Sequence, residues 1–281
     1  MKNIIRAIIA VLAAAVLCWS PTADAYDQAI YEAQQKLEEL GYDPGEADGI
    51  RGAKTVTAIK LFQEDSGLPP TGRLDEQTKA KLKAQPAPSQ FSLHEAVLLN
   101  DPILIKALIE GGADVNARDK LGTTPLHVAV VNGYQQIASL LIEQGADVNA
   151  GDVRELTPVH AAAWMGYRDT VALLITHGAN IDARDKDGLT PLHTAALAGR
   201  TDTVALLIEM GADVNAKNKI ALTPLHAAAL AGYRETAALL IAKGADVDVR
   251  SKDGFTPLQL ASQKKHLKVV QLLQEHQSQE K

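Results

Sequence analysis

The chain has 281 residues, with 28 lysines and arginines against 34 aspartates and glutamates, giving a formal net charge of −6. This acidic balance argues against a nucleic-acid role, because nucleic-acid binding favours a basic stripe. The length allows about two domains. Aromatic residues make up only 4% of the chain and alanine and leucine dominate, which is more typical of stacked helices than of sheet.

The first 25 residues have the pattern of an export signal. Lys2 and Arg6 provide a positive start, residues 4–17 form an apolar stretch apart from Arg6, and Ala23-Asp24-Ala25 is a small-residue cleavage site. We therefore predict cleavage after Ala25 and a periplasmic location. Without this segment the formal net charge becomes −7, from 26 basic and 33 acidic residues.

Two alternatives compete with a cleaved signal. An uncleaved membrane anchor would need a longer apolar stretch. A lipoprotein would be attached through Cys18, but Leu17 stands where a lipid-attachment site favours a small residue. Cys18 is the only cysteine, so the cleaved chain forms no disulfide and its stability depends on packing.

Residues 26–83 show three helical patterns. The first has apolar residues at positions 30, 33, 37 and 40, the second covers 55–64, and the third covers 75–82. Turn-rich loops at 43–49 and 67–72 separate them. The sequence predicts a small three-helix domain, followed by a Pro-rich linker at 84–90.

Two motifs in this domain resemble the peptidoglycan-binding domain of bacterial wall hydrolases. One is Leu40-Gly41-Tyr42 followed by Asp48-Gly49-Ile50-Arg51-Gly52, and the other is Gly67-Leu68-Pro69-Pro70-Thr71-Gly72. The resemblance covers nearly all of residues 28–83 and implies a wall-binding module. Arg51 departs from the family, which usually carries an aromatic residue there, and this departure puts aromatic stacking on a sugar in doubt.

The resemblance predicts a peptidoglycan-binding groove near Asp48, Arg51, Thr55 and Gln63. Arg51 is expected to pair with a stem-peptide carboxylate, and Gln63 to bond peptide amides. The alternative is that these polar residues only stabilise loops. Asp43, Glu46 and Asp48 are also spaced like part of a calcium loop, but three carboxylates are an incomplete ligand set, so a solvated turn is the favoured interpretation.

The second part of the chain is built on a 33-residue period. The tetrapeptide Thr124-Pro125-Leu126-His127 returns three times, at 157–160, 190–193 and 223–226, with a degraded copy at 256–259 and a worn one at 91–94. A hexapeptide like Gly145 to Ala150 closes each period. Such self-similarity predicts a solenoid in which each repeat packs against its neighbours.

This pattern resembles ankyrin repeats. The resemblance implies an all-α fold: an ankyrin α-solenoid of about six units at 91–276, after the three-helix domain, with a polar tail at 277–281. Lys265 replaces the helix-separating glycine of the last unit, which suits a terminal cap. Glu155 and Ala221 replace turn glycines, which predicts that those two turns are reshaped.

One histidine occurs in each of five units, at positions 94, 127, 160, 193 and 226. The family geometry implies a separation of about 10 Å, too far for a shared metal with ligands at about 2 Å. We interpret these histidines as structural, bonding the turns between units. No catalytic constellation, metal site or cofactor site is predicted.

In ankyrin arrays the turn tips and first helices form a concave face, and here that face is apolar. The resemblance predicts a protein-binding stripe of ten residues centred on Trp164, a residue type enriched at interface cores. The alternative is packing against adjacent units. The stripe comprises Val131, Arg154, Leu156, Trp164, Met165, Leu189, Leu197, Leu222, Leu230 and Phe255.

These features together predict a monomeric, non-enzymatic periplasmic scaffold. Its partners would be peptidoglycan, through residues 26–83, and a protein, through the ankyrin array. The alternatives are an interaction module without wall binding, a wall hydrolase, or a regulator of a separate hydrolase.

Overall fold

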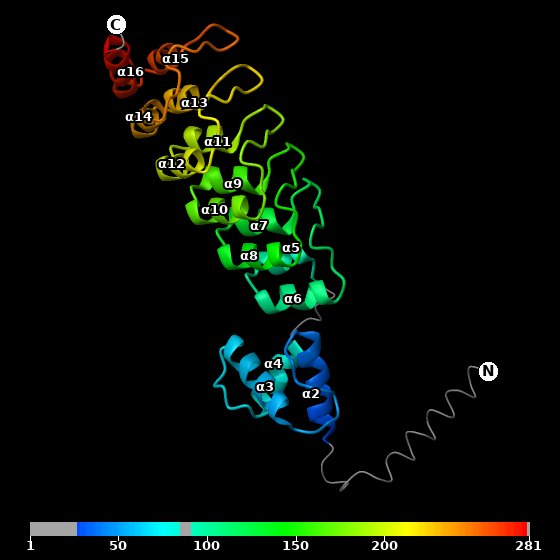
Figure 1. Ribbon diagram of the computed structural model, residues 1–281. Helices are drawn as coiled ribbons and strands as arrows, with labels where there is room; N and C mark the ends of the chain where they lie inside the picture. Colours follow the sequence, from blue (N-terminus) through cyan, green and yellow to red (C-terminus); the bar gives the residue numbers. More distant parts are fainter. Residues whose placement is uncertain (1–26, 85–90, 280–281) are drawn as a thin grey trace, which may run out of the picture. The chain divides into compact units, whose positions relative to one another are not determined.

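The computed structural model describes residues 27–84 and 91–279 of the chain (Figure 1). The predicted export signal, nearly all of the predicted linker and the last two residues lie outside the described residues. The described part contains fifteen helices and no strand, which confirms the predicted all-α fold. The chain divides into two compact units, one within residues 1–90 and one within 91–281. We call them the N-terminal domain and the repeat array.

The N-terminal domain consists of α2 (Gln28–Glu39), α3 (Ala53–Asp65) and α4 (Glu76–Ala84). Apolar residues at helical spacing meet in one small core, and the ring of Tyr42 packs edge-on against that of Phe62 with 5.8 Å between centroids. The core residues are Ala33, Leu37, Ala58, Ile59, Phe62 and Leu82.

Two buried glutamines fix the loops of this domain. The Gln34 amide accepts the backbone N–H of Gly49 at 2.8 Å and donates to Thr55 Oγ1 at 3.1 Å. The Gln63 amide accepts the backbone N–H of Gly72 at 2.8 Å and donates to the Thr78 hydroxyl at 2.9 Å. Because both glutamine side chains are only 1% exposed, their amides supply the hydrogen bonds that water would otherwise make to the loop backbone.

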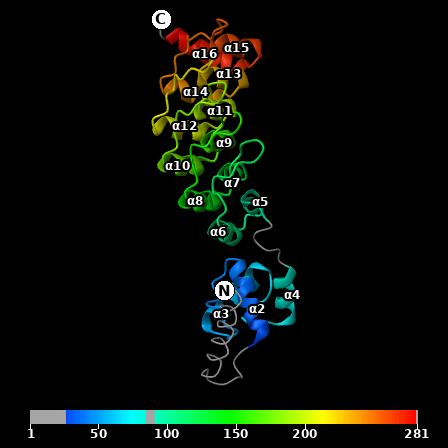
Figure 2. The ribbon, with the colours of Figure 1, turned by 90° about the vertical axis from the view of Figure 1, so that its right-hand side faces the viewer.

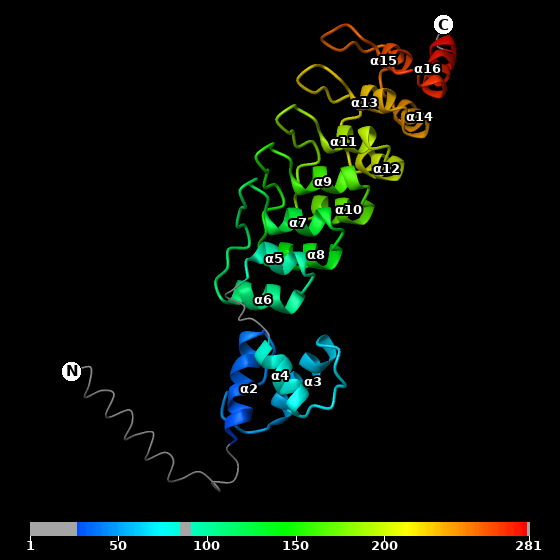
Figure 3. The same ribbon diagram turned by 180° about the vertical axis from the view of Figure 1, so that it is seen from behind.

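The repeat array contains six consecutive helix pairs, which we number as repeats 1 to 6. The first helices of the pairs form one row, the second helices form another, and the connecting turns project from one side (Figures 1 and 3). Figure 2 shows the pairs stacked in chain order. The pairs are α5 (Leu93–Leu98) and α6 (Pro102–Glu110), α7 (Pro125–Val131) and α8 (Gln135–Glu143), α9 (Pro158–Met165) and α10 (Arg168–Thr176), α11 (Pro191–Leu197) and α12 (Thr201–Glu209), α13 (Pro224–Ala231) and α14 (Arg234–Ala242), and α15 (Pro257–Gln263) and α16 (Leu267–Gln279).

The recurring tetrapeptide caps the first helix of repeats 2 to 5 and joins each of these helices to the next repeat. In repeat 2, Thr124 is the N-cap and its Oγ1 lies 2.8 Å from His127 Nδ1. The other ring nitrogen, Nε2, donates to the Leu156 carbonyl of the next turn at 3.0 Å. The same bonds recur at His160, His193 and His226. This geometry confirms the structural interpretation of the histidine row.

Five turns, numbered 1 to 5, lead into α7, α9, α11, α13 and α15. They cover residues 119–123, 152–156, 185–189, 218–222 and 251–255. Glycines at positions 122, 188 and 254 take φ of 73°, 77° and 82°, whereas Glu155 and Ala221 take 61° and 59°. The closing backbone bonds are 2.9 Å in turn 2 and 3.0 Å in turn 4, like those of the glycine turns. The prediction that these two turns are reshaped is therefore wrong, because the substituted residues adopt the left-handed conformation instead.

Turns 2 and 4 also lack a second stabilising contact. In turns 1, 3 and 5 an arginine just before the turn (Arg118, Arg184 or Arg250) donates to the carbonyl of the turn glycine, at 3.2, 3.3 and 2.8 Å. Gly151 and Lys217 occupy the equivalent positions of turns 2 and 4. Backbone strain and the absent arginine bond therefore occur together in alternate turns.

Ala221→Gly is expected to stabilise the array. A left-handed L-residue costs about 1–2 kcal/mol, whereas the extra backbone entropy of glycine costs roughly 0.5–1 kcal/mol. The free energy of unfolding should therefore rise by about 1 kcal/mol, measured by urea denaturation followed by circular dichroism. The reverse change, Gly188→Ala, is the control and should destabilise, because its Cβ would lie 2.9 Å from the Lys219 backbone nitrogen. Equal midpoints for all three proteins would contradict the assignment of strain.

Candidate functional site

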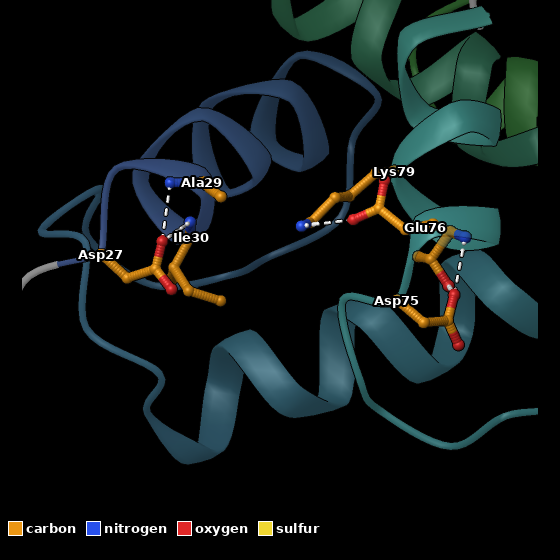
Figure 4. A network of polar contacts seen from close by, with 7 residues as sticks. Asp27, Ala29, Ile30, Asp75, Glu76 and Lys79 are labelled. Carbon is orange, nitrogen blue, oxygen red and sulfur yellow. Dashed lines mark hydrogen bonds and ion pairs between the residues drawn. The ribbon is translucent and has the colours of Figure 1, made fainter.

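The N-terminal domain has a cavity of about 530 Å³ at the start of α2. Three cationic side chains from separate segments line it: Arg51 from the loop before α3, Arg73 from the loop before α4, and Lys79 from α4. Figure 4 shows Lys79 reaching from α4 toward the start of α2. The remaining lining residues are Asp27, Ala29, Ile30, Gly49, Leu74 and Asp75.

The two carboxylates of this cavity bond within the fold. Asp27 caps α2, accepting the backbone N–H of Ala29 at 2.8 Å, and Asp75 accepts the hydroxyl and backbone N–H of Thr78 at 2.7 and 2.8 Å (Figure 4). The hydroxyl bond, followed by the backbone bond, lowers the pKa of Asp75 below its usual value. Both carboxylates thus act as helix caps.

The cations are less fully engaged. Arg51 donates one bond, to the Gly72 carbonyl. Lys79 pairs with Glu76 at 2.9 Å, and the hydrogen bond to that carboxylate raises the pKa of Lys79. Among the described residues, the Arg73 guanidinium has no protein partner. The cavity therefore offers donors to an anionic group, and Arg73 is the most available of them.

The four predicted wall-binding residues do not converge on this cavity. Arg51 lines the cavity. Asp48 is exposed and does not line it. The hydrogen bond that Asp48 accepts from the Gln34 amide, followed by the one from the Ile50 N–H, lowers the pKa of Asp48. Thr55 and Gln63 are each 1% exposed and bond the loops from inside, so the structure assigns them a structural role. Sequence reasoning missed Arg73 and Lys79, which only the fold brings beside Arg51.

The possible calcium loop resolves into separate contacts. Asp43 pairs with Lys54 at 2.9 Å and accepts the Gly45 N–H at 3.1 Å. Asp48 accepts the Gln34 amide at 2.9 Å. Across residues 27–84 and 91–279, no three His, Cys, Asp or Glu side chains are grouped to hold a metal.

The repeat array has a mainly apolar groove of about 590 Å³. Turn 2 contributes Arg154 and Leu156, α9 contributes Trp164 and Met165, and turn 3 contributes Leu189. The rest of the lining is Val131, His160, Ala161, Asp185, Thr194 and Leu197. Seven of the ten residues of the predicted stripe thus meet in one groove. Leu222, Leu230 and Phe255 belong to later repeats and lie outside it.

Trp164 is the prominent exposed residue of this groove. Its side chain is 47% exposed although it follows the fully buried Ala163. Its backbone carbonyl accepts a bond from Arg200 Nε at 3.0 Å, which fixes the end of α9. A large aromatic side chain on a rigid helix end is the kind of residue that dominates protein interfaces.

The buried histidines are neutral and fully bonded. Burial lowers the pKa of His127, His160 and His226 below the usual imidazole value, and that of His193 to about 4. In each, Nδ1 bonds the capping threonine and Nε2 bonds the next turn. Neither nitrogen of these rings is available as a catalytic base.

The fold defines a helical repeat protein with a small appended three-helix domain. Residues 93–185, 151–218 and 217–281 match the family described as "Ankyrin repeats (3 copies)", so the chain belongs to the ankyrin-repeat proteins. Residues 26–82 match the family described as "Putative peptidoglycan binding domain". Both matches agree with the resemblances drawn from the sequence.

Similarity to curated proteins is confined to short segments. Localization factor PodJL of Caulobacter vibrioides is 44% identical over 50 residues, which are 18% of this chain and 5% of that protein. Human Protein phosphatase 1 regulatory subunit 27 is 42% identical over 61 residues, which are 22% of this chain and 40% of that protein. The chain thus spans less than half the length of either relative. Of the helices in the described ranges, none has the length and apolar character to cross a membrane.

The buried histidines predict an acid-sensitive array. An unfolded histidine has a pKa near 6.5, whereas folded His193 has a pKa of about 4, so the unfolded chain binds more protons between these values. The stability that this histidine contributes is therefore complete above about pH 6.5 and is lost as the pH falls toward about 4, with a slope of up to roughly 1.4 kcal/mol per pH unit.

His193→Gln should flatten this slope by one proton, as measured by urea denaturation at pH 7, 6 and 5. Gln259 already fills the equivalent place in repeat 6, where it accepts the Thr256 N–H at 3.0 Å. Leu267→Gln, an exposed change that removes no titratable group, is the control and should keep the wild-type slope. A slope in His193→Gln equal to that of the wild type would contradict this account.

Proposed function

We propose that the chain is a non-enzymatic scaffold of the bacterial periplasm, which binds peptidoglycan through its N-terminal domain and a protein through its ankyrin groove. The observation that carries this proposal is the pairing of two unlike sites in one chain. One is a cation-lined cavity in a domain of the peptidoglycan-binding family, and the other is an apolar groove on an ankyrin array. The predicted export signal in the first 25 residues supports the proposed location.

The cation-lined cavity suits the carboxylates of peptidoglycan stem peptides. A second cavity of about 540 Å³ shares Ala29, Leu74 and Lys79 with the first, so the two adjoin along α2 and α4. An adjoining pair of cavities offers an extended site to a linear polymer. Arg73 and Arg51 supply planar guanidinium groups, which bind carboxylates with two parallel hydrogen bonds.

The groove on the array suits a protein partner. It gathers apolar side chains from three repeats and includes the exposed Trp164. A monomeric protein gains no stability from a half-exposed tryptophan, whereas a partner that covers it removes a large apolar area from water. Catalysis is not proposed, because the buried histidines are bonded within the fold.

Arg73→Glu should weaken binding to purified, insoluble peptidoglycan sacculi. Loss of a charge-assisted hydrogen bond costs about 1.5–3 kcal/mol, which corresponds to a roughly 10- to 100-fold lower affinity. The measurement is co-sedimentation of the chain lacking residues 1–25 at low and moderate salt. Lys81→Glu, an exposed change on α4 outside both cavities, is the matched control.

Equal sedimentation of Arg73→Glu and wild type would show that the cavity is not the peptidoglycan-binding site. Failure of the wild type to sediment with the sacculi would refute wall binding. The second outcome, with partner capture retained, favours an interaction module without wall binding. Release of soluble muropeptides from the same sacculi would contradict the non-enzymatic assignment.

Trp164→Asp should abolish capture of the protein partner. The partner is first identified by crosslinking in intact cells, and its affinity for the wild type and the variant is then compared. The affinity should fall by at least about 30-fold, as for a hot spot of 2 kcal/mol or more. Leu267→Asp is the control, because Leu267 is 76% exposed at the start of α16 and lies outside the groove. Undiminished capture by Trp164→Asp would exclude the groove.

A further inference from the structure

The groove on the array has one accessible charged side chain, and the sign of that charge indicates which partner fits the groove. Among its lining residues three have side chains that can carry a charge: Arg154, Asp185 and His160. Asp185 is 4% exposed, and its Oδ1 accepts the backbone N–H groups of Asp187 and Leu189 at 2.9 and 2.7 Å. His160 is buried and neutral. Arg154 is therefore the accessible charge of the groove.

The Arg154 guanidinium has no protein partner within the described part of the chain. The three ion pairs found there all lie in the N-terminal domain, so neither Asp185 nor the adjacent Glu155 pairs with Arg154. Only its backbone is used: the N–H donates to Asp152 Oδ1 at 2.7 Å, and the carbonyl accepts from Lys186 at 2.9 Å. These two bonds fix the place of Arg154 while leaving its five side-chain donors open.

Covering this groove with an apolar surface alone would be unfavourable. A partner that contacts Leu156, Trp164 and Leu189 also removes water from Arg154, and an uncompensated desolvated cation opposes binding. A carboxylate that meets the guanidinium replaces the lost water with a charge-assisted, two-pronged bond. The groove therefore selects for a carboxylate beside an apolar side chain and against partners that lack one.

We propose that the groove recognises a polypeptide segment in which a bulky apolar residue lies beside an aspartate or glutamate, with the apolar side chain against Trp164 and the carboxylate on Arg154. This inference rests on the proposed protein-binding function of the groove and adds the chemistry of the partner. Arg154 is the residue that determines specificity, and Trp164 is the apolar contact.

The test is selection of a random 12-residue peptide library displayed on phage against the immobilised chain lacking residues 1–25. Enriched sequences should place aspartate or glutamate within about two residues of leucine, isoleucine, phenylalanine, methionine or tryptophan. Binding of a selected synthetic peptide is then measured by tryptophan fluorescence, because Trp164 is the only tryptophan beyond residue 25.

Arg154→Glu should weaken the selected peptide by about 10- to 100-fold, and exchange of the peptide's acid for lysine should restore binding to Arg154→Glu alone. Lys120→Glu, an exposed charge reversal in turn 1 outside the groove, is the matched control and should leave binding unchanged. Glu155→Gln removes the neighbouring carboxylate and should preserve or strengthen binding.

The outcomes distinguish this inference from the proposed protein-binding function on which it rests. Peptides that require Trp164 but lack an acid, or that bind Arg154→Glu as well as wild type, overturn the inference and leave the groove as a protein-binding site. If no enriched peptide loses binding to Trp164→Asp, the groove is not a peptide-binding site, and both the inference and the protein-binding half of the proposed function fail.

Discussion

The repeat array depends on one hydrogen-bonded relay, in which a histidine joins the cap of its own helix to the turn of the next repeat. His193 Nδ1 lies 2.9 Å from Thr190 Oγ1, and Nε2 donates to the Leu222 carbonyl at 2.9 Å. The relay satisfies a helix cap and a turn carbonyl at once, inside a protein interior where an unsatisfied group would cost about 1–3 kcal/mol. The relay requires a neutral imidazole ring that carries its proton on Nε2. The same bonds therefore fix the tautomer of the ring, hold the ring in the interior and fix the spacing of neighbouring repeats.

Because the relay holds each turn to the preceding repeat, the turns can differ in their residues and in their other hydrogen bonds. Turns 1, 3 and 5 combine a glycine with an arginine bond to its carbonyl, whereas turns 2 and 4 have neither and hold Glu155 and Ala221 in the left-handed region. The positions of the turns nevertheless match, because histidines 127 and 193 bond the carbonyls of residues 156 and 222 in turns 2 and 4. Strain in these turns is therefore tolerated because the relay determines their conformation. Turn 2 also contributes Arg154 to the groove.

The sequence predicts the periodic features and fails where the outcome depends on non-local contacts. The 33-residue period specifies the helix pairs, the caps and the histidine bonds, because each involves residues at fixed spacing. It also locates most of the groove, since Trp164 and Met165 are departures from the repeat. Thr55 and Gln63 look like surface polar residues, yet they are buried because the loops need amide and hydroxyl partners inside. Arg73 carries no local signal, and only the folded loop brings it into the cavity with Arg51.

The groove is centred on repeat 3, whose bonds to the following repeat differ at one position from those of the other repeats. In the segments that follow α6, α8 and α12, Asn116, Asn149 and Asn215 each donate a side-chain bond to a glycine carbonyl of the following repeat, at 3.2, 3.0 and 3.1 Å. Asp182, the equivalent residue after α10, has no amide to donate, and its one bond to the next repeat is 3.3 Å long. Repeat 3 is nevertheless bonded to repeat 4 at Trp164, whose backbone carbonyl accepts a bond from Arg200 Nε at 3.0 Å. The end of α9 that displays Trp164 is therefore held in place before a partner arrives, and a preorganised contact lowers the entropic cost of binding.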